Sequence, residues 1–364
     1  MSRVLVVGGG LIGLLSALEL HDRGFEVTLL ERGETGRESS WAGGGILSPI
    51  YPWRYPAEVN RLALWSHDHY PALVKRIIET TGENPELYHS GLLVLDPEQL
   101  ASALTWAKQY QQPYEMLAGK DLVAIDPHLH WPVDQAILFP HIGQVRNPFL
   151  TKALRALLDH LGVAIRTHTE VTGFDIAQGK VAALLAGEQR FSADAYVVAT
   201  GAWSGELMRS VGLDLPITPV KGQMLLYRID PGHLQHIVLY QGKYIIPRQD
   251  GHVLVGSTME HVGFDKQLTA SAAQELSDYA HTLLPALNPQ TLVKQWAGLR
   301  PGSPDGIPMI GQVPGLENLY LNAGHFRNGV CMGPATTRLL ADVVCKKAGE
   351  FADNDYGFGR VRLS

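Results

Sequence analysis

Cysteine is scarce in this 364-residue chain, which contains only Cys331 and Cys345. The two thiols lie far apart in a helical register, so they form neither a disulfide framework nor a metal-binding or redox pair. The fifteen histidines are scattered and lack the spacing of a zinc site. The sequence therefore predicts no metal centre and a reducing, cytoplasmic environment.

Strong net charge and long hydrophobic runs are also missing. The formal net charge is -6, with 18% charged residues, which gives no general attraction to nucleic acid or to an anionic membrane. No apolar run approaches the roughly 20 residues of a membrane span. The printed sequence opens directly on a strand pattern, so we expect no cleavable signal peptide. These absences predict a globular protein without nucleic-acid or membrane partners.

Glycine is abundant, with 38 residues, and its most informative use is GGGLIG at residues 8–13. An apolar strand over residues 3–7 ends in this turn, and apolar residues then recur at helical spacing. Gly8 permits the tight turn, Gly10 lets the backbone approach a pyrophosphate, and Gly13 lets the helix pack against the strand. Because the helix N-terminus then faces the anion, the pattern predicts a Rossmann-like dinucleotide site.

A second strand, over residues 25–30, ends at Glu31, about 20 residues past the glycines. A carboxylate at this place accepts hydrogen bonds from ribose hydroxyls and disfavours a 2′-phosphate, which argues against NADP. The alternative is a glycine-rich turn with an incidental surface glutamate. The motif by itself leaves NAD and FAD unresolved.

A polar, glycine-rich stretch, GETGRESSWAGGG, follows and ends at Gly45. The hydroxyls of Ser39 and Ser40 and the open backbone of residues 43–45 suit a second phosphate or a ring edge. A flexible surface connection is the alternative. Residues 46–56, rich in proline and aromatics, form either a lid or a packed loop.

The rest of the chain indicates two domains with different kinds of sheet. Apolar strands over residues 163–167, 195–200 and 319–321, with another over 171–174, suggest a buried parallel sheet. Strands over residues 88–95, 223–228, 243–247 and 252–256 are mostly shorter and alternating. We expect helices over residues 58–80, 97–110, 148–162, 269–284 and 334–346. The expected nucleotide-binding domain comprises residues 1–83, 146–217 and 301–364, and the expected second, mostly antiparallel α+β domain comprises residues 84–145 and 218–300.

The end of the chain repeats the strand, glycine loop and helix of its beginning. Gly324 and Gly329 bracket a loop whose N–H groups, with the following helix, would stabilise the charge on a reduced flavin's N1–C2=O edge. A second anion-binding loop suits the long FAD molecule better than NAD. The alternative is a structural C-terminal helix after a glycine turn.

Five ordered motifs resemble the glycine oxidase and D-amino-acid oxidase family of FAD-dependent amine oxidases, most closely glycine oxidases of the thiamine-biosynthesis type. They are GGGLIG (8–13), VKGQM (220–224), YIIPR (244–248), WAGLRPGSPDGIPMIG (296–311) and AGHFRNGV (323–330). The resemblance spans essentially the whole chain. It implies an α/β fold like that of D-amino-acid oxidase and glutathione reductase, with a Rossmann-like FAD-binding domain.

The glycine loops and the resemblance together assign a set of cofactor contacts. For His325, an ordinary loop histidine is the alternative. The expected FAD contacts are Gly8, Gly10, Leu11, Ile12, Gly13, Glu31, Arg32, Ser39, Ser40, Gly44, Gly45, Ile46, Val171, Gly201, His325, Phe326, Arg327, Asn328, Gly329 and Val330.

Arg300, in GLRPG, is the expected substrate anchor, because a planar guanidinium binds a carboxylate bidentately. A surface ion pair is its alternative role. The resemblance adds Tyr244 and Arg327 as substrate contacts and Met259 as part of the pocket wall. A packing role in a strand is the alternative for the tyrosine, and a core position is the alternative for the methionine.

Two features depart from related enzymes. Gly242 and Lys243 precede Tyr244, where the resembling glycine oxidases have a histidine two residues before the tyrosine. A flexible lysine there would reshape the entrance. Residues 296–306 contain no cysteine, unlike the covalently flavinylated sarcosine oxidases, so we expect non-covalent FAD.

The resemblance implies oxidation of a small amino acid, with glycine first and sarcosine or small D-amino acids next. A hydride would pass to flavin N5, and dioxygen would then yield hydrogen peroxide. The imine would hydrolyse to the 2-oxo acid and ammonia or supply thiazole synthesis, with thiazole synthase as a partner. The resemblance also implies a homo-oligomer, a tetramer. The alternatives are a D-amino-acid or sarcosine dehydrogenase, an enzyme acting on modified tRNA uridine, or a non-catalytic FAD-binding protein.

Overall fold

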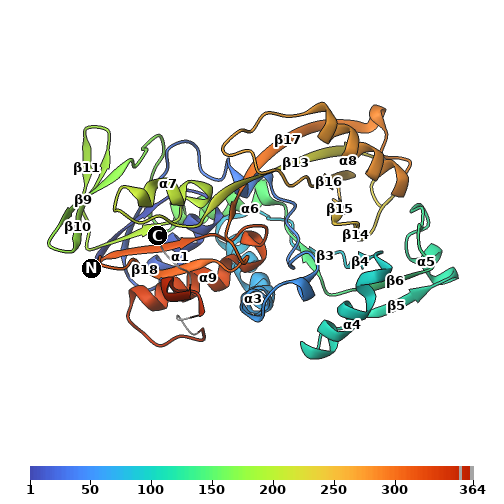
Figure 1. Ribbon diagram of the computed structural model, residues 1–364, viewed down its shortest axis with the longest axis horizontal. Helices are drawn as coiled ribbons and strands as arrows, with labels where there is room; N and C mark the ends of the chain where they lie inside the picture. The colour runs from blue at the N-terminus through green and yellow to red at the C-terminus, as the bar shows by residue number, and fades with distance from the viewer. Residues whose placement is uncertain (352–354, 361–364) are drawn as a thin grey trace.

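The computed structural model describes residues 1–351 and 355–360, and its two large sheets lie side by side (Figure 1). The first sheet has six strands, and its five-strand parallel part confirms the expected nucleotide-type sheet. Only its edge strand β18 runs antiparallel to its neighbour. Their spatial order is β18 (Met309–Gln312), β19 (Leu319–Ala323), β12 (Ala195–Val198), β1 (Arg3–Val7), β2 (Glu26–Leu30) and β8 (Ala164–Arg166).

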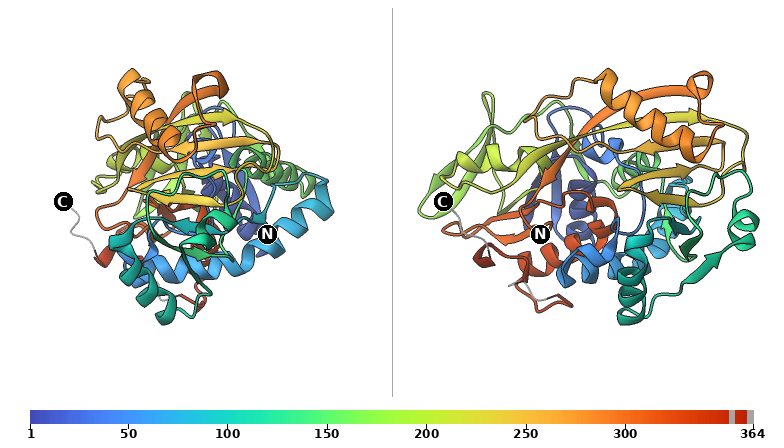
Figure 2. Two further views of the ribbon diagram at one scale, coloured as in Figure 1. Left: turned by 90° about the vertical axis from the view of Figure 1, so that its right-hand side faces the viewer. Right: turned by 45° about the vertical axis from the view of Figure 1, so that its right-hand side comes forward.

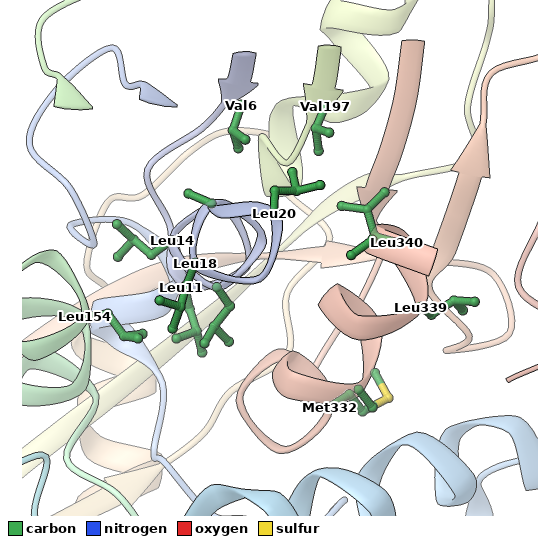
Figure 3. Packing of buried hydrophobic residues seen from close by; sticks show 14 of the residues in the cluster. Val6, Leu11, Leu14, Leu18, Leu20, Leu154, Val197, Met332, Leu339 and Leu340 are labelled. Carbon is green, nitrogen blue, oxygen red and sulfur yellow. The ribbon is translucent and has the colours of Figure 1, made fainter. Parts of the chain in front are cut away.

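Both faces of this sheet are buried, because side chains alternate along each strand. Val4 and Val6 of β1 pack toward a large helical layer, whereas Leu5 and Val7 pack toward the opposite face. Figure 3 shows how residues of α1 meet Leu154 and Leu340 in the helical layer. That layer consists of α1 (Leu11–Asp22), α3 (Ala57–Thr81), α6 (Asn147–His160) and α9 (Gly329–Val344).

The opposite face carries a small three-stranded sheet that the sequence did not predict in full. A strand was expected over residues 171–174, but β9 starts two residues later and pairs with β10 rather than with the parallel sheet. Val171 itself remains free to line the cavity described below. The elements on this face are β9 (Gly173–Ala177), β10 (Lys180–Ala186), β11 (Gln189–Phe191) and α7 (Ser204–Arg209).

The second sheet has eight strands and is mostly antiparallel, as expected for the sheet of the second domain. Its single parallel pair joins β14 to β4. The expected strand over residues 88–95 is divided by Gly91, at φ 69°, into a short β3 (Tyr88–His89), which pairs with β7 (Gly143–Gln144), and β4. The order is β17 (Leu292–Gly302), β13 (Thr218–Arg228), β16 (His252–Gly256), β15 (Lys243–Pro247), β14 (Ile237–Tyr240), β4 (Leu92–Val94), β6 (Gln135–Phe139) and β5 (Glu115–Ala118).

The helices α5 (Lys120–Ile125) and α8 (Ala270–Leu283) pack on one face of the second sheet (Figure 2). On the other face lie α4 (Leu100–Gln109) and the loop of residues 46–56. Tyr51 in that loop is 2% exposed, so the loop is packed rather than free. The Met224 and Tyr244 side chains belong to this second face, which turns toward the first sheet.

The start of the last long helix corrects one expectation. We predicted a helix over residues 334–346, yet α9 begins at Gly329 and contains Pro334. A proline inside a helix leaves the carbonyl four residues earlier without its donor. Here the Tyr70 hydroxyl of α3 donates to the Val330 carbonyl at 2.6 Å, and Ser66 Oγ accepts from Ala335 N–H at 3.0 Å. Hydrogen bonds from α3 therefore replace backbone bonds that the proline removes from α9.

The expected domain boundaries remain predictions. Residues 352–354 and 361–364 of the expected nucleotide-binding part lie outside the described residues. In the part of the chain that the structure describes, no helix is long and apolar enough to cross a membrane.

Candidate functional site

One cavity of about 410 Å³ lies where the parallel strands end and the second sheet faces them. On one side, its lining comes from β1 of the first sheet and from the helices α1 and α9. On the other side, it comes from β13, β15 and β17 of the second sheet. Both expected glycine loops and the expected substrate anchor thus meet in one place. The predicted residues in the lining are Gly8, Gly10, Leu11, Ile12, Glu31, Arg32, Ser39, Ser40, Gly44, Val171, Gly201, Tyr244, Arg300, His325, Phe326, Arg327, Gly329 and Val330.

Four expected cofactor contacts lie just behind this lining. Gly13 packs α1 against the turn, since a Cβ there would lie 1.7 Å from the Gly8 carbonyl oxygen. Gly45 has φ 80°, and a Cβ would lie 2.0 Å from the Val145 carbonyl oxygen. Ile46 and Asn328 are buried beside the two loops. These residues shape the loops, and their direct contact with a cofactor stays a prediction.

The first turn of α1 forms one end of the cavity. Gly8 has φ 107°, a conformation that glycine adopts without strain. The Leu11 N–H donates to Ser40 Oγ at 2.8 Å, so the loop of residues 33–45 is anchored to the helix start. A serine hydroxyl that accepts this bond can still donate to an anion. The helix dipole and the loop therefore offer one anion site together.

Glu31 stands at the end of β2, as expected, and its carboxylate also organises the turn. Its Oε2 accepts from the Gly9 N–H at 2.6 Å and its Oε1 from the Gly33 N–H at 2.9 Å. Each carboxylate oxygen accepts more than one hydrogen bond, so a ribose hydroxyl can be added. The residue thus fixes the backbone that surrounds its own ligand site.

The far end of the cavity is built by the loop before α9. Asn328 is the N-cap residue of α9 and makes no side-chain cap hydrogen bond, so the first N–H groups of the helix remain available to a ligand. Asn322 Oδ1, in the lining, is buried without a hydrogen-bond partner among the described residues. A helix N-terminus and an unpaired acceptor suit a polar ring edge. The two ends together fit an elongated dinucleotide such as FAD.

Arg300 projects from β17, at the edge of the second sheet, where Pro301 is tolerated because the strand pairs only with β13. Its Nη2 donates to Ser257 Oγ at 2.7 Å, and its Nη1 donates to the Thr258 carbonyl at 3.2 Å. Among residues 1–351 and 355–360, no acidic side chain pairs with it. Arg300 is therefore oriented by neutral groups, and its charge is not neutralised.

Burial lowers the pKa of Arg300; Tyr244 opposes this shift and the positive charge of Arg327 adds to it. A buried cation beside another cation is unfavourable unless an anion binds. Tyr55 lies close to both arginines, and burial raises the pKa of its hydroxyl. The arrangement therefore suits a small anion.

Tyr244 lines the cavity from β15, and its hydroxyl lies 3.7 Å from Met224 Sδ. Lys243 points to the opposite face of the sheet, where its Nζ lies 2.9 Å from Glu275 Oε1 of α8. The expectation that Lys243 reshapes the entrance is therefore wrong, because neighbouring residues of a strand face opposite sides.

Met259 is not among the cavity residues, and its side chain is 55% exposed. It follows Ser257 and Thr258 into an outer segment, and the bridge between Lys221 and Glu260 fixes this course. The structure therefore does not support Met259 as part of the pocket wall.

Arg248, in the YIIPR motif, anchors the glycine-rich loop that contains Gly44. It is 4% exposed, and it donates to the carbonyls of Gly44 at 2.8 Å and Val145 at 3.1 Å. Burial lowers its pKa to about 10. Its role is to position residues that line the cavity.

His325 and Cys331 are both buried near the second loop. Burial lowers the pKa of His325 to about 3, so it is neutral, and its Nε2 lies 3.2 Å from Thr336 Oγ1. Burial raises the pKa of the Cys331 thiol, and this residue does not line the cavity. In the described ranges, no group of His, Cys, Asp or Glu is arranged to bind a metal ion.

Several residues of the lining are not among those predicted from the sequence. Gly222 and Met224 stand inside the VKGQM motif, so the motif contained a signal that was not assigned to positions. Trp203 follows Gly201, and Arg32 lies over its ring at 3.8 Å. Ile50 comes from the packed loop, and no local pattern marks it as a lining residue.

A family model described as DAO, FAD dependent oxidoreductase, matches residues 3–343. The glycine oxidase of Pseudomonas aeruginosa is 48% identical over 343 residues, which is 94% of each chain. The bifunctional protein ThiO/ThiG of a Synechocystis species is 34% identical over 94% of this chain and 51% of that protein. The crystal structure of glycine oxidase from Geobacillus kaustophilus superposes with a TM-score of 0.93 at 31% identity, with all of both chains covered.

These similarities confirm the expected fold and the dependence on FAD, whose binding the glycine loops and Glu31 fit. The individual contact residues stay predictions. The chain belongs to the DAO family of FAD-dependent oxidoreductases.

Proposed function

We propose that this protein oxidises the amine of small amino acids, with glycine as the preferred substrate. The observation that carries this proposal is the guanidinium of Arg300, which lines the cavity and finds no acidic partner in the described chain. A guanidinium binds a carboxylate through two parallel hydrogen bonds. The similarity to curated glycine oxidases supports the same substrate class.

The residues around Arg300 limit the size of the substrate. Gly44, Ile50 and Met224 line the same cavity and are small or apolar, so they leave room for a short side chain and exclude water. Tyr244 and Arg327 are the proposed second and third contacts of the carboxylate. A glycine molecule anchored there would present its Cα–H toward the α9 end of the cavity.

FAD, when bound, supplies the acceptor for the hydride that leaves Cα. The chain does not need a general base, because the substrate can bind with its amine already neutral. The substrate loses two electrons and two hydrogens in all, and dioxygen takes them up to form hydrogen peroxide. Hydrolysis of the imino acid then gives glyoxylate and ammonia.

The partner proposals rest on the relatives. Fusion of a homologous chain in the ThiO/ThiG protein supports a link to thiazole synthesis, in which the imine would pass to a thiazole synthase.

Both cysteines stand outside the cavity lining, which supports non-covalent FAD. Tetramer formation and a cytoplasmic location remain predictions.

Anaerobic mixing of the yellow holoenzyme with glycine, sarcosine, D-alanine and D-proline tests the proposal. We expect glycine to bleach the flavin absorbance with the highest ratio of rate to apparent Kd. Oxygen uptake with stoichiometric peroxide would then identify an oxidase, whereas turnover only with a dye would identify a dehydrogenase. Absence of bleaching by every amino acid would contradict the enzymatic proposal and favour a non-catalytic FAD-binding protein.

A further inference from the structure

A lysine is buried on the face of β13 that turns away from the cavity. The Lys221 side chain is 2% exposed, and its Nζ lies 2.9 Å from Glu260 Oε2 and donates to the Gln267 carbonyl at 3.1 Å. The Glu260 side chain is 25% exposed, so the lysine carries most of the desolvation cost, which the mutual attraction often does not offset. Neither residue of this pair takes part in the proposed reaction.

The carboxylate of this pair gathers two further side chains. Glu260 Oε1 accepts from Thr258 Oγ1 at 2.5 Å and from Gln223 Nε2 at 2.9 Å. Burial alone would raise the pKa of Glu260, but these bonds and Lys221 outweigh it and lower the pKa. The carboxylate is therefore ionised at neutral pH, and each of its oxygens has a partner in the protein.

Backbone bonds tie the same residues to the strand. Lys221 N–H donates to the Glu260 carbonyl, and Glu260 N–H donates to the Lys221 carbonyl, both at 2.9 Å. Gln223 N–H donates to Thr258 Oγ1 at 2.9 Å. The Thr258 hydroxyl thus accepts from β13 and donates to Glu260, which fixes its rotamer and its backbone.

Thr258 contacts Arg300 through its own carbonyl, which accepts from Nη1 at 3.2 Å. The neighbouring Ser257 Oγ accepts from Nη2, and the Lys221 carbonyl lies 3.4 Å from Nη1. All three acceptors therefore belong to segments that Lys221 and Glu260 join. The guanidinium plane is set by residues whose own positions depend on Lys221 and Glu260.

The outer part of the same segment makes an exposed contact in addition to the bond between Lys221 Nζ and the Gln267 carbonyl. Lys266 Nζ lies 3.0 Å from Glu38 Oε2, with 46% and 36% of the two side chains exposed. Exposed ion pairs of this kind contribute little. The bonds of Thr258 and Glu260 to β13 lie at the base of the segment, next to the acceptors of Arg300.

We propose that Lys221, Glu260 and Thr258 form a positioning network that aims the Arg300 guanidinium at the substrate carboxylate. The inference rests on the proposed function, because it takes Arg300 as the carboxylate anchor. These residues do not touch the substrate. They act by fixing the direction in which Arg300 offers its two N–H groups.

The test titrates FAD-loaded holoenzyme with acetate and follows the flavin absorbance, with anaerobic reduction by saturating glycine as a second readout. Thr258→Val removes the hydroxyl at nearly constant volume, and we expect the Kd for acetate to rise about tenfold. The limiting reduction rate should change less than about twofold, because glycine that does bind reacts normally. Thr258→Ser keeps the hydroxyl and should restore binding to near that of the wild type.

Glu260→Gln and the double variant Lys221→Met/Glu260→Gln test the charges, and the double variant avoids an unpaired buried ion. Both should raise the Kd for acetate, whereas Lys266→Met, in the same segment, should leave it unchanged. Lower melting temperatures with an unchanged Kd would show a purely structural role and overturn the inference. An unchanged Kd in Arg300→Ala would instead overturn the proposed anchor, and the inference with it.

Discussion

Gly222 of β13 lies so close to the guanidinium of Arg300 on β17 that a side chain at residue 222 would displace the guanidinium. A Cβ on Gly222 would lie 2.1 Å from Arg300 Nη2. The glycine of the VKGQM motif therefore leaves the space that the Arg300 guanidinium occupies.

Gly222→Ala should push the guanidinium away from its present place. We expect the Kd for acetate to rise at least about tenfold while FAD stays bound, since the cofactor loops lie elsewhere. Flavin absorbance titration measures both quantities. Gly359→Ala is the matched control, because at that exposed glycine no atom of the described residues lies within 4 Å of the Cβ position. Wild-type affinity in the Gly222 variant would argue against this steric account.

Gly13→Ala should disrupt cofactor binding and stability together, since its Cβ would lie 1.7 Å from the Gly8 carbonyl oxygen. We expect purified protein with little yellow colour and a melting temperature lower by several degrees. Ser16→Ala, in the same helix, removes a buried hydroxyl that has no hydrogen-bond partner in the described part of the chain, and it should be neutral or stabilising. A yellow, stable Gly13→Ala protein would contradict the close packing of α1.

The beginning of the chain could be predicted in detail, whereas the start of α9 could not. Strand, glycine turn and helix follow one another locally up to Asp22, so their pattern is visible in the sequence. In contrast, α9 continues through Pro334 only because Tyr70 and Ser66 of α3 serve the freed backbone groups. Those partners are distant in sequence, and no local propensity indicates them.

The site shows the same division between local and distant information. Residue type and motif pointed to Arg300 and Glu31, because guanidinium and carboxylate chemistry is specific. Sequence could not show that Lys243 turns toward α8 or that Met259 is exposed, since strand register and loop course decide both. The steric need for Gly222 likewise appears only once β13 and β17 are paired.

Tyr70→Phe should destabilise the protein by about 1–3 kcal/mol, because the partly buried Val330 carbonyl loses its donor. Pro334→Ala restores a helical N–H for that carbonyl, so the tyrosine change should cost less in its presence. A double-mutant cycle by denaturant unfolding with excess FAD measures this coupling. Equal costs in both backgrounds would mean that the hydroxyl does not compensate for the proline.

Acid should destabilise the folded state through His141. Burial, followed by the nearby charges of His67 and His89, lowers the pKa of His141 to about 4. Below about pH 6.5 the histidine binds a proton in the unfolded chain but stays neutral in the folded protein. The free energy of unfolding therefore falls as the pH drops toward 4. His325 acts in the same direction, with a pKa of about 3. In His141→Gln we expect the loss of unfolding free energy between about pH 7 and pH 5 to shrink by about 1 kcal/mol. An unchanged pH slope in denaturant titrations would rule out this origin.

The affinity of Arg300→Ala for glycine tests the account most directly. Anaerobic titration with glycine, followed by flavin absorbance, should show an apparent Kd at least about 100-fold above that of the wild type. FAD should remain bound, and Arg155→Ala on the exposed side of α6 should titrate as the wild type does. An Arg300→Ala enzyme that is reduced by glycine with unchanged apparent affinity would contradict the account.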